Sequence, residues 1–151
     1  MTKTAFLFAG QGAQYLGMGR DLYDRYPIVK ETIDQASQVL GYDLRDLIDK
    51  EETKLNQTRY TQPAILATSV AIYRLLKEKG YQPDMVAGLS LGEYSALVAS
   101  GALDFEEAVA LVAKRGAYME EAAPAGSGKM VAVLNTPVEV IEEACKTASE
   151  V

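Results

Sequence analysis

One serine stands in a setting that could make it a nucleophile. The pentapeptide Gly88-Leu89-Ser90-Leu91-Gly92 follows the short apolar run Met85–Ala87 and precedes the helical run Glu93–Ser100. A Gly-x-Ser-x-Gly between a strand and a helix is typical of a nucleophile elbow, a turn whose flanking positions have no room for a Cβ atom. Such a turn exposes the serine Oγ and points the next backbone N–H at a developing oxyanion. The sequence contains no histidine, so it predicts a nucleophile without the base that would activate it.

A second segment could supply the other half of an oxyanion site. Gly10-Gln11-Gly12-Ala13-Gln14 follows the apolar run Ala5–Phe8, and loops at the carboxyl ends of parallel strands line active-site crevices. Such a loop could bring another backbone N–H to the elbow, although an ordinary flexible turn would have the same composition.

Arg115 is the third candidate. Phe105, Ala108, Leu111, Val112 and Met119 form one apolar stripe at helical spacing, and Arg115 falls in its middle. A buried arginine needs a partner. Arg115 could therefore pair with a structural carboxylate, reach the surface, or grip the carboxylate of a ligand with both prongs of its guanidinium.

Apolar runs and turn residues alternate along the chain as they do in α/β proteins. Runs at 5–8, 85–87 and 129–134 predict strands, and longer runs predict helices over 21–26, 28–40, 43–48, 64–79, 93–100, 104–122 and 136–148. Pro63 is expected at the first helical position of the run 64–79, which is too apolar all round for a surface helix. Asp104 with Glu107 has the spacing of an N-terminal capping box. Strands separated by long helices imply parallel pairing.

Composition excludes several function classes. The formal net charge of −6 argues against nonspecific binding to nucleic acid or anionic membranes. One cysteine allows no internal disulfide and suggests no metal site. No run has the length of a signal peptide or a membrane span, which predicts a cytoplasmic protein.

Two glycine-rich stretches fail as nucleotide-binding motifs. Tyr15 stands where the third glycine of a dinucleotide fingerprint is required after Gly10-Gln11-Gly12. In Gly126-Ser127-Gly128-Lys129, the phosphate-loop pattern needs glycine at 123 and serine or threonine at 130, where the chain has Ala123 and Met130.

Taken together, the motifs resemble the malonyl-CoA:acyl-carrier-protein transacylase family. The resemblance is carried by Gly10–Gln14, Tyr60-Thr61-Gln62-Pro63-Ala64, Gly88–Ala96 and Lys114-Arg115-Gly116, in the family's order and spacing along essentially the whole chain. It implies the N-terminal part of an α/β-hydrolase-like subdomain, with an incomplete parallel sheet, over residues 1–125. It also implies the first β-α half of a ferredoxin-like small subdomain over residues 126–151.

The resemblance also implies the site and the reaction. Ser90 would carry a malonyl group taken from malonyl-CoA, and Arg115 would hold its free carboxylate, with Met119 and Gln62 beside the substrate. The backbone N–H groups of Gln11 and Leu91 would form the oxyanion hole. Acyl carrier protein would receive the malonyl group on its phosphopantetheine thiol, in fatty acid biosynthesis, with no metal or cofactor of the enzyme's own.

The sequence departs from the family pattern in two places. Leu89 stands where the family usually has a histidine before the nucleophile, which we expect to change packing rather than chemistry. The family's catalytic histidine lies far downstream, and these 151 residues contain none. The chain therefore resembles the N-terminal part of such an enzyme, and we expect it to be nearly inactive alone.

Two other functions remain open from the residues. A serine hydrolase could share the elbow, although a hydrolase of neutral esters needs no cation beside its serine. A catalytically silent domain that binds acyl-CoA or a carrier protein would be consistent with the missing histidine.

Overall fold

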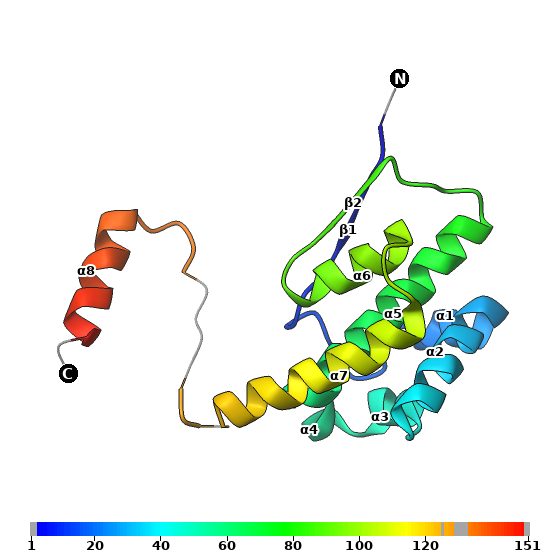
Figure 1. Ribbon diagram of the computed structural model, residues 1–151, viewed down its shortest axis with the longest axis horizontal. Helices are drawn as coiled ribbons and strands as arrows, with labels where there is room; N and C mark the ends of the chain where they lie inside the picture. The colour runs from blue at the N-terminus through cyan, green and yellow to red at the C-terminus, as the bar shows by residue number, and fades with distance from the viewer. Residues whose placement is uncertain (1–2, 125, 129–132, 150–151) are drawn as a thin grey trace.

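The computed structural model describes residues 3–124, 126–128 and 133–149 (Figure 1). Its elements run β1 (Ala5–Phe8), α1 (Arg20–Arg25), α2 (Pro27–Leu40), α3 (Leu44–Lys50), α4 (Glu52–Leu55), α5 (Thr58–Glu78), β2 (Met85–Gly88), α6 (Leu91–Ser100), α7 (Phe105–Ala122) and α8 (Val138–Ser149). The predicted α/β class is confirmed by the alternation of strands and helices.

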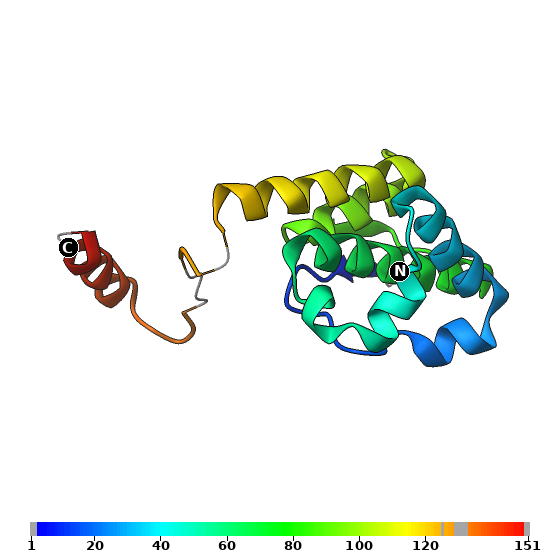
Figure 2. The same ribbon diagram turned by 90° about the horizontal axis from the view of Figure 1, so that it is seen from below.

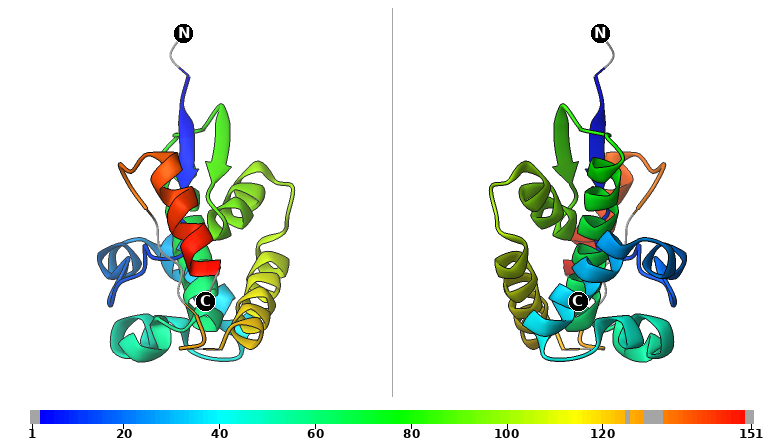
Figure 3. Two further views of the ribbon diagram at one scale, coloured as in Figure 1. Left: turned by 90° about the vertical axis from the view of Figure 1, so that its left-hand side faces the viewer. Right: turned by 90° about the vertical axis from the view of Figure 1, so that its right-hand side faces the viewer.

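β1 and β2 pair in parallel, as predicted, and lie side by side in Figure 3. The register aligns Phe6 with Val86 and Phe8 with Gly88. The Phe6 and Phe8 rings meet the edge of Tyr73 from α5, each with centroids 6.4 Å apart, so this face of the sheet is covered. The opposite face carries Leu7, which is 80% exposed. Among the described residues the sheet is therefore covered on one face only.

The core is built around α5, which runs through the middle of the helical layer (Figure 2). Helices α2, α6 and α7 all pack against it. Ala64, Leu66, Val70 and Ala71 are completely buried, so the all-round apolar character of this run correctly predicted a buried helix.

The beginning of α5 corrects the sequence prediction. The helix starts at Thr58, and Pro63 lies inside it rather than at its first position. Proline lacks the N–H that would bond the carbonyl four residues earlier. The buried face of α5 compensates for that loss, because Pro63 and its neighbours are enclosed.

Helix caps explain where several other elements begin and end. Pro27 is the first residue of α2, where its missing N–H costs nothing. Asp104 Oδ1 accepts hydrogen bonds from the backbone N–H groups of Glu106 and Glu107, which confirms the predicted start of α7. Gly41 ends α2 in the left-handed conformation. The short helix α4 was not predicted, since four residues carry no periodic signal.

The C-terminal segment contains its predicted helix but not the end of its predicted strand. Helix α8 corresponds to the helix expected over 136–148 and lies apart from the other helices in Figures 1 and 2. The predicted strand 129–134 falls largely outside the described residues, and its last two, Val133 and Leu134, are not in a strand. The division into 1–125 and 126–151 therefore stays a prediction.

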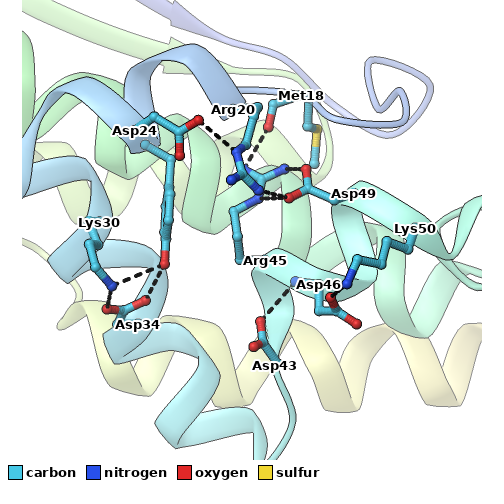
Figure 4. A network of polar contacts seen from close by, with 11 residues as sticks. Met18, Arg20, Asp24, Lys30, Asp34, Asp43, Arg45, Asp46, Asp49 and Lys50 are labelled. Carbon is cyan, nitrogen blue, oxygen red and sulfur yellow. Dashed lines mark hydrogen bonds and ion pairs between the residues drawn. The ribbon is translucent and has the colours of Figure 1, made fainter.

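A polar cluster fastens the segment after β1 to α3 (Figure 4). The buried Arg45 donates from Nη1 to the Met18 carbonyl, 3.0 Å away, and from Nε and Nη2 to Asp49. Asp49 also accepts from Arg20 Nη1 at 2.6 Å. Burial alone would raise the pKa of the Asp49 carboxyl, but the hydrogen bonds from Arg45 and Arg20 outweigh it and hold the pKa below its ordinary value. This ion pairing anchors the chain that follows the glycine-rich loop.

Candidate active site

Ser90 lies in a strained turn between β2 and α6. Its backbone has φ 52° and ψ −107°, a conformation that costs a non-glycine residue about 1–3 kcal/mol. The Ser90 side chain makes no capping bond to α6, so Oγ stays available at the tip of the turn. The backbone angles of Ser90 support the predicted elbow geometry.

The glycines on either side explain why the turn can be so tight. A Cβ added to Gly88 would lie 2.0 Å from the backbone of Gly92. A Cβ added to Gly92 would lie 2.1 Å from the carbonyl oxygen of Phe8 in β1. Both contacts are with backbone, which cannot move aside, so the Gly-x-Ser-x-Gly spacing is a steric requirement at this position.

The glycine-rich loop lies directly against the elbow. A Cβ on Gly10 would come within 2.6 Å of the Leu89 carbonyl oxygen. Gln11 Nε2 donates to Thr58 Oγ1 and Gln14 Nε2 donates to Asn56 Oδ1, each at 3.0 Å. These bonds tie the loop to the beginning of α5, so it is held by side chains rather than left as a free turn.

The two N–H groups expected to form an oxyanion hole are unused within the described residues. Neither the Gln11 nor the Leu91 backbone N–H donates to any protein acceptor there. Leu91 is the first residue of α6, where N–H groups have no partner inside the helix. An anion above Ser90 would also meet the positive end of the α6 dipole.

Arg115 reaches Ser90 from α7. Its Nη2 donates to Ser90 Oγ at 3.1 Å and its Nη1 to Gln62 Oε1 at 2.8 Å. Gln62 is completely buried, and its Nε2 donates to Met119 Sδ at 3.2 Å. Four residues selected from the sequence, in α5, in α7 and in the turn before α6, thus form one connected chain of contacts.

Arg115 has no carboxylate partner among the described residues. Every ion pair recorded there involves another lysine or arginine. Its polar partners, Gln62 and Ser90, are neutral, and its guanidinium carbon lies 5.5 Å from the centre of the Tyr94 ring. A half-buried cation held by neutral groups is ready to receive an anion.

Close packing between α7 and α5 brings Arg115 to Gln62. A Cβ on Gly116 would lie 2.7 Å from the Arg59 Cα, so only glycine permits this approach. Glu120 then accepts from the Arg59 backbone N–H at 3.0 Å and from Arg59 Nε at 2.6 Å. Burial pushes the pKa of the Glu120 carboxyl upward, but these bonds outweigh it and keep the pKa below its ordinary value.

The structure corrects the environment predicted for Arg115. Phe105, Ala108 and Val112 are buried on the predicted stripe, but Leu111 is 45% exposed and Met119 39% exposed. Arg115 is half-buried at the end of the stripe rather than enclosed in its middle. Leu111 and Met119 instead line an open apolar hollow of about 400 Å³ together with Arg115, Lys114, Tyr118 and Ala122.

Sequence reasoning missed the residues that support the site. Tyr94 lies next to the predicted elbow, and a ring four residues after Ser90 is on the same side of α6, which could have identified it. Thr58 and Glu120 have no comparable signal, since their partners are distant in sequence.

A family model for the acyl transferase domain matches residues 5–150. The chain belongs to the acyl transferase domain family. One member, from Haemophilus influenzae, is named malonyl CoA-acyl carrier protein transacylase; it is 53% identical over an alignment of 153 residues that covers 99% of this chain and 49% of that protein. The crystal structure of MCAT from Streptococcus pneumoniae has a TM-score of 0.90 and 92% identity, over 98% of this chain and 48% of its own.

A third family member has been solved with a partner. The structure of a type II PKS acyl-carrier protein in complex with its malonyl-transacylase has a TM-score of 0.87 and 48% identity, over 97% of this chain and 48% of that chain. The chain thus spans about half the length of the acyl transferase relatives it matches.

Two further observations concern only the part of the chain that the structure describes. No helix there is both long and apolar enough to cross a lipid bilayer. No group of three or more acidic, histidine or cysteine side chains there is arranged to hold a metal ion.

Proposed function

We propose that the parent protein of this chain transfers a malonyl group from malonyl-CoA to acyl carrier protein, as the names of its relatives indicate for them. The observation that carries the proposal is Arg115, which lies 3.1 Å from the Ser90 oxygen and has only neutral partners among the described residues. A malonyl group differs from an acetyl group by one carboxylate, and that carboxylate is costly to desolvate unless a cation meets it.

In the first step, Ser90 Oγ attacks the thioester carbonyl carbon of malonyl-CoA. The Ser90 proton passes to a base, the carbonyl oxygen becomes an oxyanion, and the Gln11 and Leu91 N–H groups stabilise it. When the oxyanion collapses, the carbon–sulfur bond breaks, and CoA leaves as a thiol after taking the proton back from the base. Malonyl-Ser90 remains.

In the second step, the phosphopantetheine thiol of acyl carrier protein attacks the malonyl ester. The same base removes the thiol proton and returns it to Ser90 Oγ as the ester bond breaks. Arg115 holds the malonyl carboxylate through both steps, while Met119 and Gln62 border the acyl group. No metal or cofactor is required by this chemistry.

These 151 residues hold no histidine, so the base comes from elsewhere in the parent protein. We assign the described core to an α/β-hydrolase-like subdomain and the segment after residue 125 to a ferredoxin-like one. The exposed face of the two-stranded sheet supports this assignment, because parallel sheets are normally covered on both faces. We place the protein in the cytoplasm, where malonyl-CoA and acyl carrier protein are its partners.

The serine hydrolase alternative is disfavoured by Arg115. A hydrolase of neutral esters gains nothing from a guanidinium within hydrogen-bonding distance of its nucleophile.

A transfer assay tests the proposal. The full-length protein is incubated with malonyl-CoA and acyl carrier protein carrying its phosphopantetheine, and malonyl-carrier protein is measured by intact mass. We expect transfer that depends on Ser90 and on the carrier thiol. Free malonate formed without any malonyl-carrier protein would identify a hydrolase instead.

A further inference from the structure

Tyr94 contacts the arginine of the site without being part of any hydrogen bond to it. It lies in α6, four residues after Ser90 and half-buried, with the Arg115 guanidinium carbon 5.5 Å from its ring centre. The first turn of α6 thus carries an aromatic surface for the cation, and the nucleophile directly precedes that turn. The positions of the nucleophile and of the cation are therefore both set by the start of α6.

The chemistry of an aromatic surface suits this position. A carboxylate here would hold Arg115 firmly but neutralise it, leaving no charge for a ligand. An aromatic ring attracts the guanidinium through its quadrupole and leaves the net charge intact. This attraction does not depend on how the guanidinium is turned within its own plane. The N–H groups at the edge of the guanidinium therefore remain free to change hydrogen-bond partners.

Another arginine of the molecule shows the same set of partners in a purely structural place. Arg74 Nη1 donates to Thr32 Oγ1 and Gln35 Oε1, and its guanidinium carbon lies 4.5 Å from the Phe105 ring centre. There, burial lowers the pKa of Arg74. Arg74 is thus held at close range by a ring and neutral oxygens, with the Asp104 and Glu106 carboxylates acting from farther away.

We propose that Tyr94 is a positioning residue that holds Arg115 beside Ser90 and thereby sets the preference for acyl groups bearing a carboxylate. The inference rests on the proposed malonyl transfer and deepens it. Before acylation, Arg115 Nη2 donates a hydrogen bond to Ser90 Oγ. Once Oγ is esterified, Nη2 turns to the ligand carboxylate while the guanidinium stays against the ring. Without the ring, Arg115 would swing into the open hollow on α7.

The test compares Tyr94→Leu and Tyr94→Phe in the full-length enzyme, with kcat/KM measured for malonyl-CoA and for acetyl-CoA. Leucine removes the quadrupole, so we expect the malonyl/acetyl ratio to fall about tenfold. Phenylalanine keeps the ring, so the ratio should stay within about twofold of wild type. Tyr81→Leu, the same change at an exposed tyrosine in the loop before β2, is the matched control.

A double-substitution cycle separates positioning from general damage. In an Arg115→Ala background, Tyr94→Leu should lower the ratio no further, because the residue it positions is gone. Equal losses for both substrates in Tyr94→Leu, or a loss in Tyr94→Phe as large as in Tyr94→Leu, would overturn the inference. A preference lost in Arg115→Ala but kept in Tyr94→Leu would overturn it while leaving malonyl transfer intact. A wild-type enzyme without any malonyl preference would overturn the proposed function and this inference together.

Discussion

Replacing Gln62 with glutamate should place a carboxylate against Arg115 and occupy the cation that a malonyl group needs. Gln62 is completely buried, and its Oε1 lies 2.8 Å from Arg115 Nη1. Glutamate has nearly the same size and shape, so it fits the same space. The change gives up only the weak hydrogen bond from Gln62 Nε2 to Met119 Sδ at 3.2 Å.

The size of the effect follows from the loss of a charge partner. A desolvated charge that loses its partner costs about 2–5 kcal/mol. At about 1.4 kcal/mol per factor of ten, kcat/KM for malonyl-CoA should fall by roughly 30-fold to several thousand-fold. Acetyl-CoA brings no carboxylate, so its kcat/KM should fall far less.

The assay measures transfer by the full-length enzyme from both thioesters to acyl carrier protein. Gln62→Met is the matched control, because methionine is neutral and of similar length, so no carboxylate neutralises the positive charge of Arg115. We expect the malonyl/acetyl ratio to collapse with glutamate and to stay much closer to wild type with methionine. If glutamate and methionine lower the ratio equally, Gln62 acts through packing alone and the reasoning is wrong.

Three other predictions follow from single contacts. Arg115→Ala should lower kcat/KM for malonyl-CoA by the equivalent of about 2–5 kcal/mol of transition-state binding, with a smaller effect on acetyl-CoA. Arg115→Lys should recover only part of that loss, since an ammonium cannot make the bidentate contact of a guanidinium. Equal losses for both thioesters in kinetic assays would assign Arg115 a structural role. Gly92→Ala should destabilise the protein by about 3 kcal/mol or more in urea unfolding, because its Cβ would meet the Phe8 carbonyl oxygen, whereas Gly128→Ala, with nothing nearby, should be close to neutral. The pKa of the Glu120 carboxyl is lowered in the folded state, so its contribution to the unfolding free energy is present above the ordinary carboxyl pKa of 4.5 and is lost as the pH falls through the lower folded value. The unfolding free energy of Glu120→Gln should therefore decline less steeply with falling pH than that of wild type or of the exposed control Glu121→Gln. Equal slopes of unfolding free energy against acidic pH in all three proteins would contradict this.

The elbow was the most predictable part of the molecule. Gly88 is required by the backbone of Gly92 and Glu93, within a few residues of Ser90, and Gly92 by the carbonyl oxygen of Phe8 in the neighbouring strand; both requirements come with any strand–turn–helix elbow and can be read from spacing alone. The Asp104 cap was predictable for the same reason. Turn and cap rules of this kind hold in almost any tertiary structure.

What could not be predicted depends on distant partners. Pro63 is favoured in the first turn of a helix, but α5 begins at Thr58 because Glu120 of α7 binds the Arg59 N–H there. Helical spacing placed Leu111 and Met119 on a buried stripe, yet spacing cannot say how far the covering elements extend. The contact of Arg115 with Gln62 likewise joins two helices whose approach depends on Gly116.

The most direct test of malonyl transfer through Ser90 is to locate the covalent intermediate. The full-length protein is mixed with malonyl-CoA in the absence of acyl carrier protein, quenched in acid, digested and analysed by peptide mass spectrometry. We expect one malonyl group on the peptide that contains Ser90, which disappears when acyl carrier protein is added and never forms in Ser90→Ala. A malonyl-enzyme that persists in Ser90→Ala, or an adduct on another peptide, would contradict the assignment of Ser90 as the nucleophile.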